Sequence, residues 1–307
     1  MKDRFVRFDW AIKRLLRQKA NFGVLEGFLT VFIGEKVTIV DILESESNQQ
    51  DEFDKFNRVD IKARNSKGEI IIVEVQNTSE VFYLERILYG VAKAITEHIS
   101  LGDDYGEVKK VYSISVLYFD LGEGDDYLYK GQTSFFGIHT NDELKITTRQ
   151  RDAIVRKAPE EIFPTYYLIR VNNFDRVAVS PMEEWMRYLK KGEISADAKA
   201  PGLQEAREKL LYYQMDPAER HAYDEHLNAV MIQNDVLGNA RAEGLAEGRA
   251  EGRIEGRAEG KAEGLAEGKT SQQVLTARTM LSDGMSIDLV AKYTGLTKSQ
   301  IEAFAAE

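Results

Sequence analysis

The segment RVDIKARNSKGEIIIVEVQ, residues 58–76, limits the fold of this chain more than any other stretch, because it places polar side chains where a strand should be apolar. Its second half alternates between two faces with a period of two. One face carries Ile70, Ile72, Glu74 and Gln76, and the other carries Ile71, Val73 and Val75. A strand this apolar is typical of a position buried on both faces of a sheet. An unpartnered carboxylate buried there costs several kcal/mol, which a shifted pKa or a bound cation relieves.

The first half of the segment, RVDIKAR, predicts the partner strand of a hairpin. One face carries Asp60, Lys62 and Arg64, and the other carries Val59, Ile61 and Ala63. A three-residue loop of Ser66, Lys67 and Gly68 would place Asp60 opposite Glu74, because Gly68 supplies the left-handed conformation that such loops need. Two carboxylates about 5 Å apart repel, and a divalent cation between them would relieve the repulsion. A two-residue loop would move Asp60 to the other face, so the sequence leaves both registers open.

The composition excludes several kinds of chemistry. With 307 residues, of which 43% are hydrophobic, the chain can bury a sizeable core. The absence of Cys rules out disulfides, thiolate zinc sites and a Cys nucleophile, and it fits a reducing compartment. No apolar run approaches the length of a membrane span, and the N-terminus lacks the apolar region of a signal peptide. We therefore expect a cytoplasmic protein that does not bind a membrane.

The formal net charge of −10 argues against a surface coated in basic residues. The N-terminal segment is nevertheless locally basic, through Lys2, Arg4, Arg7, Lys13, Arg14, Arg17 and Lys19. These residues are interpreted either as solvated helix faces, which we favour, or as a nucleic-acid contact.

The rest of the first half predicts a mixed α/β sandwich. Residues 9–32 have helical spacing with Asp9 as an N-cap, and residues 79–100 predict another helix capped by Ser79. The run at 111–119 is typical of a buried central strand, and 37–43 predicts a further strand. Three more strands are expected at 133–140, 143–148 and 165–171.

From Ser180 onward only helices are predicted, beginning with a capping box between Ser180 and Glu183. His221, Asp224 and His226 match no zinc spacing, so we interpret them as residues of a helix surface. Residues 242–269 repeat Ala, Glu, Gly and a basic or apolar residue every four positions. Such a repeat is either a helix that pairs with another copy through its small residues or a flexible linker. We also expect a homo-oligomer through residues 241–270 if the first alternative holds.

The last segment, residues 271–307, predicts three short helices with a helix-turn-helix spacing. Ser286 caps the second helix, and Thr297 with Gln300 forms a capping box for the third. The third helix offers only Lys298, Ser299 and Gln300 to bases or phosphates, so docking to a protein is favoured over contact with DNA.

Several segments together resemble a known family. In chain order they are RFDWAIKRLL, Asp60, IVEVQ, FYLERILYG and VYSISVLYF. This series resembles the PD-(D/E)XK nuclease-family transposases, also called recombination-promoting nucleases, over most of residues 5–270. The segment MEEWMRYLKKGE and the EGRAEG repeats are also similar to that family. The resemblance implies a restriction-endonuclease-like fold, a mixed sheet flanked by helices, followed by an all-helical C-terminal extension.

The resemblance also implies the chemistry, which is cleavage of DNA with Mg²⁺, or with Mn²⁺ in its place. Asp60 and Glu74 match the metal-binding acids, and the Val75 carbonyl is a further ligand. Gln76 stands where the wider superfamily has Lys, so it can orient water but gives less charge stabilisation. Asp9 and Arg86 are accessory candidates, for which a helix cap and a surface ion pair are the alternatives.

These expectations give four parts and two hypotheses about function. The parts are a nuclease-like core at 1–179, a helical extension at 180–240, the repeat at 241–270 and the helix-turn-helix-like segment at 271–307. The leading hypothesis is a Mg²⁺-dependent DNA endonuclease linked to recombination or mobile elements. The alternative is a catalytically weak or inactive protein of the same fold that binds nucleic acid or protein, which the missing Lys and the acidic charge favour.

Overall fold

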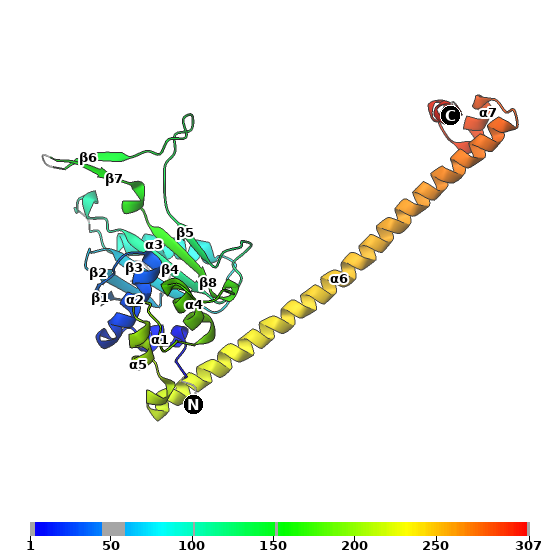
Figure 1. Ribbon diagram of the computed structural model, residues 1–307. Coiled ribbons are helices and arrows are strands. Elements are labelled where there is room, and N and C mark those ends of the chain that lie inside the picture. The colour runs from blue at the N-terminus through cyan, green and yellow to red at the C-terminus, as the bar shows by residue number, and fades with distance from the viewer. Residues whose placement is uncertain (1–3, 45–58, 101, 151–152, 306–307) are drawn as a thin grey trace. The chain divides into compact units, whose positions relative to one another are not determined.

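The computed structural model describes residues 4–44, 59–100, 102–150 and 153–305 (Figure 1). Lys2 of the basic segment, Arg58 of the predicted hairpin and the last two residues of the C-terminal segment lie outside these ranges. The chain divides into two compact units, Met1–Val230 and Met231–Glu307. The candidate site residues all belong to the first unit.

The predicted hairpin forms with the three-residue loop. Strands β2 (Ile61–Asn65) and β3 (Ile70–Gln76) are antiparallel, and Ile61 pairs with Val73. The loop is closed by the Asn65 N–H, which donates to the Glu69 carbonyl at 3.1 Å, and Gly68 has a φ of 79°. Continuing this register by one residue places Asp60, which directly precedes β2, opposite Glu74. The predicted register is confirmed, although the strand begins later than expected because the chain bends at Asp60.

A six-stranded mixed sheet extends from this hairpin in the order β1-β2-β3-β4-β8-β5. On one side β1 (Ile39–Leu43) is antiparallel to β2. On the other side β4 (Val111–Leu117) is parallel to β3, and β8 (Thr165–Arg170) is parallel to β4. The edge strand β5 (Leu128–Gly131) is antiparallel to β8. All of β4 is buried, including Ser113 and Ser115, as its almost continuous apolar sequence predicts.

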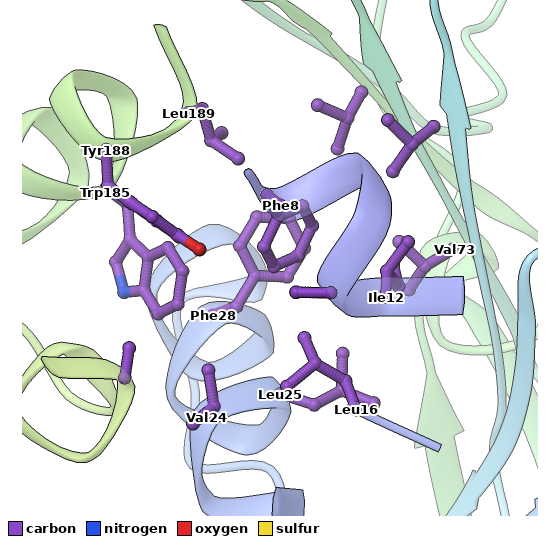
Figure 2. Packing of buried hydrophobic residues seen from close by; sticks show 14 of the residues in the cluster. Phe8, Ile12, Leu16, Val24, Leu25, Phe28, Val73, Trp185, Tyr188 and Leu189 are labelled. Atoms are coloured by element: carbon purple, nitrogen blue, oxygen red, sulfur yellow. The ribbon is translucent and has the colours of Figure 1, made fainter. Parts of the chain in front are cut away.

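Helices cover both faces of the sheet. The face that carries Ile61, Ile71 and Val73 packs with α1 (Phe8–Arg14), α2 (Phe22–Ile33), α4 (Pro181–Lys191) and α5 (Leu203–Lys209) in one large hydrophobic cluster. Figure 2 shows the aromatic centre of this cluster, where Phe8, Phe28 and Trp185 pack against one another. The opposite face carries Ile70 and Ile72 and packs with α3 (Tyr83–Thr96). The predicted mixed sheet with flanking helices is therefore confirmed.

One close approach ties the helices of the larger cluster together. Gly27 on α2 lies against the backbone of Gly202 at the start of α5, and a Cβ built on Gly27 would be 2.4 Å from the Gly202 Cα. Gly202 itself has a φ of 81°. Both positions therefore need glycine, one for space and the other for its left-handed conformation.

Four local expectations were wrong. Helix α1 begins at Phe8 with Arg7 as its N-cap, so Asp9 lies inside the helix and does not cap it. Helix α3 begins at Tyr83, so Ser79 does not cap it. Residues 133–140 form no strand, because side chains such as Phe136 and Ile138 are exposed and have no sheet to pack on. The strand expected at 143–148 is instead β6 (Ile146–Gln150), which pairs with β7 (Ala153–Lys157).

The C-terminal helices follow the predicted pattern, except that Ser286 stands at the N-cap of α7 without a capping hydrogen bond from its side chain. Helix α6 (Pro217–Ser282) contains the whole repeat, so of the two alternatives the structure has the helix. Helices α7 (Ile287–Thr294) and α8 (Lys298–Ala305) form a small core with the end of α6. Thr297 and Gln300 form the predicted capping box, with backbone-to-side-chain distances of 2.9 and 3.3 Å. Within the described ranges, no helix combines the length and the apolar character needed to cross a membrane.

Candidate active site

The predicted site residues meet in one pocket beside the hairpin. The pocket has a volume of about 590 Å³ and is lined by Lys13, Arg14, Arg17, Val59, Asp60, Glu74, Val75, Gln76 and Arg86. Asp60, Glu74, Val75 and Gln76 come from the hairpin, and Arg86 comes from the first turn of α3. Asp9, the remaining accessory candidate, does not line the pocket.

Asp60 is held by the backbone of β3 and by a cation of α1. Its Oδ2 accepts a hydrogen bond from the Val75 N–H at 2.7 Å. Its Oδ1 lies 3.7 Å from the Lys13 Nζ. Burial raises the pKa of Asp60, and the positive charge of Lys13 and the Val75 hydrogen bond oppose that change without cancelling it. The carboxylate is therefore incompletely compensated by the protein.

Glu74 is the more deeply buried acid, with 8% of its side chain exposed. The Arg86 Nη2 donates to its Oε1. Burial raises the pKa of Glu74 to about 7, although Arg86 opposes the change, and the nearby carboxylates of Asp60 and Glu80 raise it further. A carboxylate in this position lacks sufficient positive charge nearby.

Glu80 joins the site through two side chains, and the sequence analysis missed it. The Gln76 Nε2 donates to the Glu80 Oε1 at 2.7 Å, and the Arg86 Nη1 donates to the same oxygen. This arrangement ties the nitrogen of the Gln76 amide to Glu80 and leaves its oxygen as the acceptor that can face the pocket. Glu80 lies between the end of β3 and the start of α3, which is the one sequence signal that could have suggested a partner for both residues.

Three cations of the basic N-terminal segment lie at the pocket. Lys13 and Arg14 are the last residues of α1 before its C-cap, and Arg17 follows in the next turn. All three are exposed, and the Arg14 guanidinium also lies over the Trp10 ring at 5.0 Å. Side chains on a solvated helix face thus also form one wall of the pocket that holds the two acids.

Asp9 lies in a separate buried network. Its carboxylate is fully buried and accepts hydrogen bonds from Arg7 Nε at 3.0 Å and from Asn77 Nδ2 at 3.2 Å, and it lies 3.0 Å from His226 Nε2. Burial alone would raise the pKa of Asp9, but His226 and Arg7 hold it well below its usual range. His226 thus makes a hydrogen-bond contact with Asp9 and is not the exposed helix-surface residue that was expected, and this contact joins its turn of α6 to α1.

The donor set of the pocket fits a hard divalent cation. The Asp60 and Glu74 carboxylates and the Val75 carbonyl are all oxygen ligands, which Mg²⁺ prefers. Glu74 is almost fully buried and lies near the carboxylates of Asp60 and Glu80, so an additional positive charge would be stabilised there. Among the residues that the structure describes, no group of three His, Asp or Glu side chains is placed to hold a metal. The protein would thus supply few ligands and leave the others to water and phosphate, as is common for Mg²⁺.

A mixed sheet whose hairpin presents two opposed carboxylates beside basic helices defines the class of restriction-endonuclease-like nuclease folds. Residues 6–147 match the PD-(D/E)XK nuclease family transposases, and residues 276–305 match the C-terminal helix-turn-helix domain of the Rpn/YhgA-like nuclease family. These two matches confirm the resemblance inferred from the sequence. No curated protein and no solved structure matches the chain.

Proposed function

We propose that the protein is a divalent-metal-dependent DNA endonuclease that acts in recombination or on mobile elements. The observation that carries this proposal is the pairing of Asp60 with Glu74 in a pocket that also holds Lys13, Arg14, Arg17 and Arg86. An inactive protein would gain stability by replacing either acid with a neutral residue, because both pKa values are raised by burial. The acids therefore have a role other than stability.

Asp60, Glu74 and the Val75 carbonyl would hold Mg²⁺, with Mn²⁺ as a substitute. The cation, when bound, would polarise the phosphodiester and lower the pKa of a water molecule. The chain's own residues supply the remaining functions. Lys13, Arg14 and Arg17 bind the DNA backbone electrostatically, and Arg86 contacts the phosphate next to the acids.

Gln76 orients the water that attacks the phosphate. Its amide nitrogen is engaged by Glu80, so its oxygen accepts a hydrogen bond from that water. An amide cannot take up a proton or carry positive charge at neutral pH, so Gln76 positions the water without acting as a base. We therefore expect a slow enzyme whose rate depends on the metal more than on a side-chain acid or base.

The test uses supercoiled plasmid, Mg²⁺ and isosteric substitutions. Wild-type protein should nick or linearise the plasmid, whereas Asp60→Asn, Glu74→Gln and addition of EDTA should each abolish cleavage. The control is Glu85→Gln, because Glu85 is an exposed carboxylate on α3 that does not line the pocket. If the folded wild type and the two acid variants behave alike, the binding-module alternative replaces the nuclease proposal. Running the same reactions with RNA separates the two phosphodiester substrates.

We further propose that the α6 repeat pairs with a second copy of the chain. Its glutamates, such as Glu247, Glu251 and Glu255, are four residues apart, and so are the basic residues from Arg249 to Lys261. Within one helix these spacings bring like charges together, which destabilises it. A second helix can place its basic stripe against the glutamates of the first. The variant Arg249→Glu/Arg253→Glu/Arg257→Glu should therefore reduce the mass measured by light scattering, and an unchanged mass would exclude pairing through this repeat.

The helix-turn-helix segment is proposed to dock to a protein. Lys298, its main basic candidate, forms an exposed ion pair with Asp288 on α7, which competes with contact to a phosphate. Lys298→Glu should leave the DNA affinity of the full chain unchanged in a fluorescence anisotropy titration. A loss of affinity beyond threefold, on the order of 0.7 kcal/mol, would instead assign the segment to DNA.

A further inference from the structure

Arg86 occupies an oxygen atom that the proposed metal also needs. Its Nη2 donates to the Glu74 Oε1, and its Nη1 donates to the Glu80 Oε1. A guanidinium on the Glu74 oxygen blocks one coordination direction there. It also repels any cation that approaches the same carboxylate. Arg86 and a divalent metal are therefore competitors for Glu74.

The two acids that hold Arg86 differ in burial. Glu74 has 8% of its side chain exposed, whereas Glu80 and Arg86 have 37% and 33% exposed. Glu74 is also fixed in the middle of the sheet, where it pairs in register with Ser115 of β4. Arg86 is thus the part of the triad that can move, and its contact with Glu80, which also holds Gln76, can persist when the guanidinium leaves Glu74.

Glu80 also contacts Gln76 at the end of β3. It accepts the hydrogen bond of the Gln76 amide at 2.7 Å, so one carboxylate orients both the guanidinium and the amide. A second acceptor for Arg86 within the pocket would be a phosphate of bound DNA, since guanidinium groups bind phosphate in the same bidentate manner as carboxylate. Glu80 already shares the charge of Arg86 with Glu74, and a phosphate would offer the guanidinium a further acceptor, so both weaken its hold on Glu74.

We propose that Arg86 is a reversible gate on Glu74 and that Glu80 is the positioning residue that draws it off, so that metal binding and DNA binding support each other. This inference rests on the proposed metal site at Asp60 and Glu74. It gives Glu80 a function that a plain ion pair does not have. It also makes the free protein a weak metal binder that gains affinity when DNA is present.

Titration of the full-length protein with Mn²⁺ by calorimetry tests the gate without any cleavage. Arg86→Gln should tighten Mn²⁺ binding at least fivefold, because it removes the competitor. Glu80→Gln should weaken it severalfold, because Arg86 then pairs with Glu74 alone. In the double variant the Glu80 effect should largely disappear. A role of both residues in folding alone would weaken binding in both single variants, and direct metal binding by Glu80 would leave its effect intact in the double variant. Either result overturns the proposal.

Two control variants distinguish the direct contact of Arg86 with Glu74 from a general effect of charge near the pocket. Arg14→Gln removes the same charge from the pocket wall, but Arg14 lies over the Trp10 ring and not on Glu74, so this change should tighten Mn²⁺ binding much less than Arg86→Gln. Glu85→Gln removes a carboxylate from the same helix as Arg86 and should leave the affinity unchanged. Equal effects of Arg14→Gln and Arg86→Gln would contradict the gate.

The Glu74→Gln variant distinguishes a failure of this inference from a failure of the proposed function. If Glu74→Gln and Asp60→Asn bind Mn²⁺ as well as the wild type does, the metal site itself is wrong. If they lose Mn²⁺ but Arg86→Gln does not bind it more tightly, only the gate is wrong. A short duplex DNA added to the Asp60→Asn variant, which cannot cleave, reports DNA binding separately by anisotropy.

Discussion

Replacing Glu74 by Gln should stabilise the first unit of the protein at neutral and alkaline pH. Burial raises the pKa of Glu74 from an ordinary value of 4.5 to about 7. Because the folded state holds this proton more tightly than the unfolded state does, wild-type stability falls as the pH rises from 4.5 through 7. A shift of this size corresponds to about 3 kcal/mol, at roughly 1.4 kcal/mol per pKa unit. The Gln variant has no such proton and avoids the loss.

The quantity to measure is the pH dependence of the difference between the two proteins. About 1 kcal/mol of the effect is already present at about pH 5, so the advantage of Glu74→Gln should grow by roughly 2 kcal/mol by about pH 8. Urea unfolding in EDTA, followed by tryptophan fluorescence, suits this purpose, because Trp10 and Trp185 are the two tryptophans of the chain and both lie in the first unit. The altered Arg86 contact adds a constant to the difference in unfolding free energy, so it does not affect how that difference changes with pH.

A matched control and an opposing condition complete the test. Glu85→Gln on the exposed side of α3 should differ from the wild type by no more than about 0.5 kcal/mol at every pH. Saturating Mg²⁺ should favour the wild type over Glu74→Gln, since only the wild type retains both acids. If the difference between wild type and Glu74→Gln in EDTA is constant from acid to alkaline pH, the account of Glu74 as an undercompensated buried acid is refuted.

Three further predictions concern stability. Gly27→Ala should cost about 1 to 3 kcal/mol in urea unfolding, because its Cβ would meet the Gly202 backbone; Gly23→Ala, whose Cβ meets only the flexible Glu205 side chain, is the control that should cost clearly less. His226→Ala should cost about 1 to 3 kcal/mol, because the fully buried Asp9 loses a partner, and a variant as stable as wild type would show that Arg7 and Asn77 suffice. Alanine at Gly252, Gly256 and Gly260 should stabilise α6 by about 1 kcal/mol per site, because no atom outside the helix lies within 4 Å of the added methyl groups. Circular dichroism should report the higher helicity, and unchanged thermal melting would contradict this prediction.

The hairpin could be predicted from sequence because its rules are local. The period of two assigns each side chain to a face, and a three-residue loop that ends at Gly68 was one of two registers that the sequence allowed. The structure has that loop, and its register, continued by one position beyond Ile61 and Val73, places Asp60 opposite Glu74. The strand β4 likewise follows from an almost continuous apolar run.

The surroundings of the acids could not be predicted in this way, because they come from separate elements. Glu80 reaches the site only because α3 begins after it and turns Arg86 back towards β3. Asp9 looked like a helix cap, since capping and ion pairing use the same side chain near a helix start; the deciding partner, His226, is more than two hundred residues away in sequence. The exposed apolar residues at 133–140 imitate a strand because composition does not report whether a neighbouring strand is present.

The locality of the hairpin has a consequence for the order in which the protein folds. Asp60, Glu74 and Val75 all belong to one continuous hairpin, and hairpins form within microseconds, before distant segments dock. The electrostatic repulsion between the two carboxylates must therefore be compensated early in folding. During synthesis Lys13 leaves the ribosome before Asp60, and Arg86 leaves it after Glu74. The segment that carries the counter-charge of Asp60 is thus already synthesised when the hairpin closes, whereas Arg86, the counter-charge of Glu74, is not.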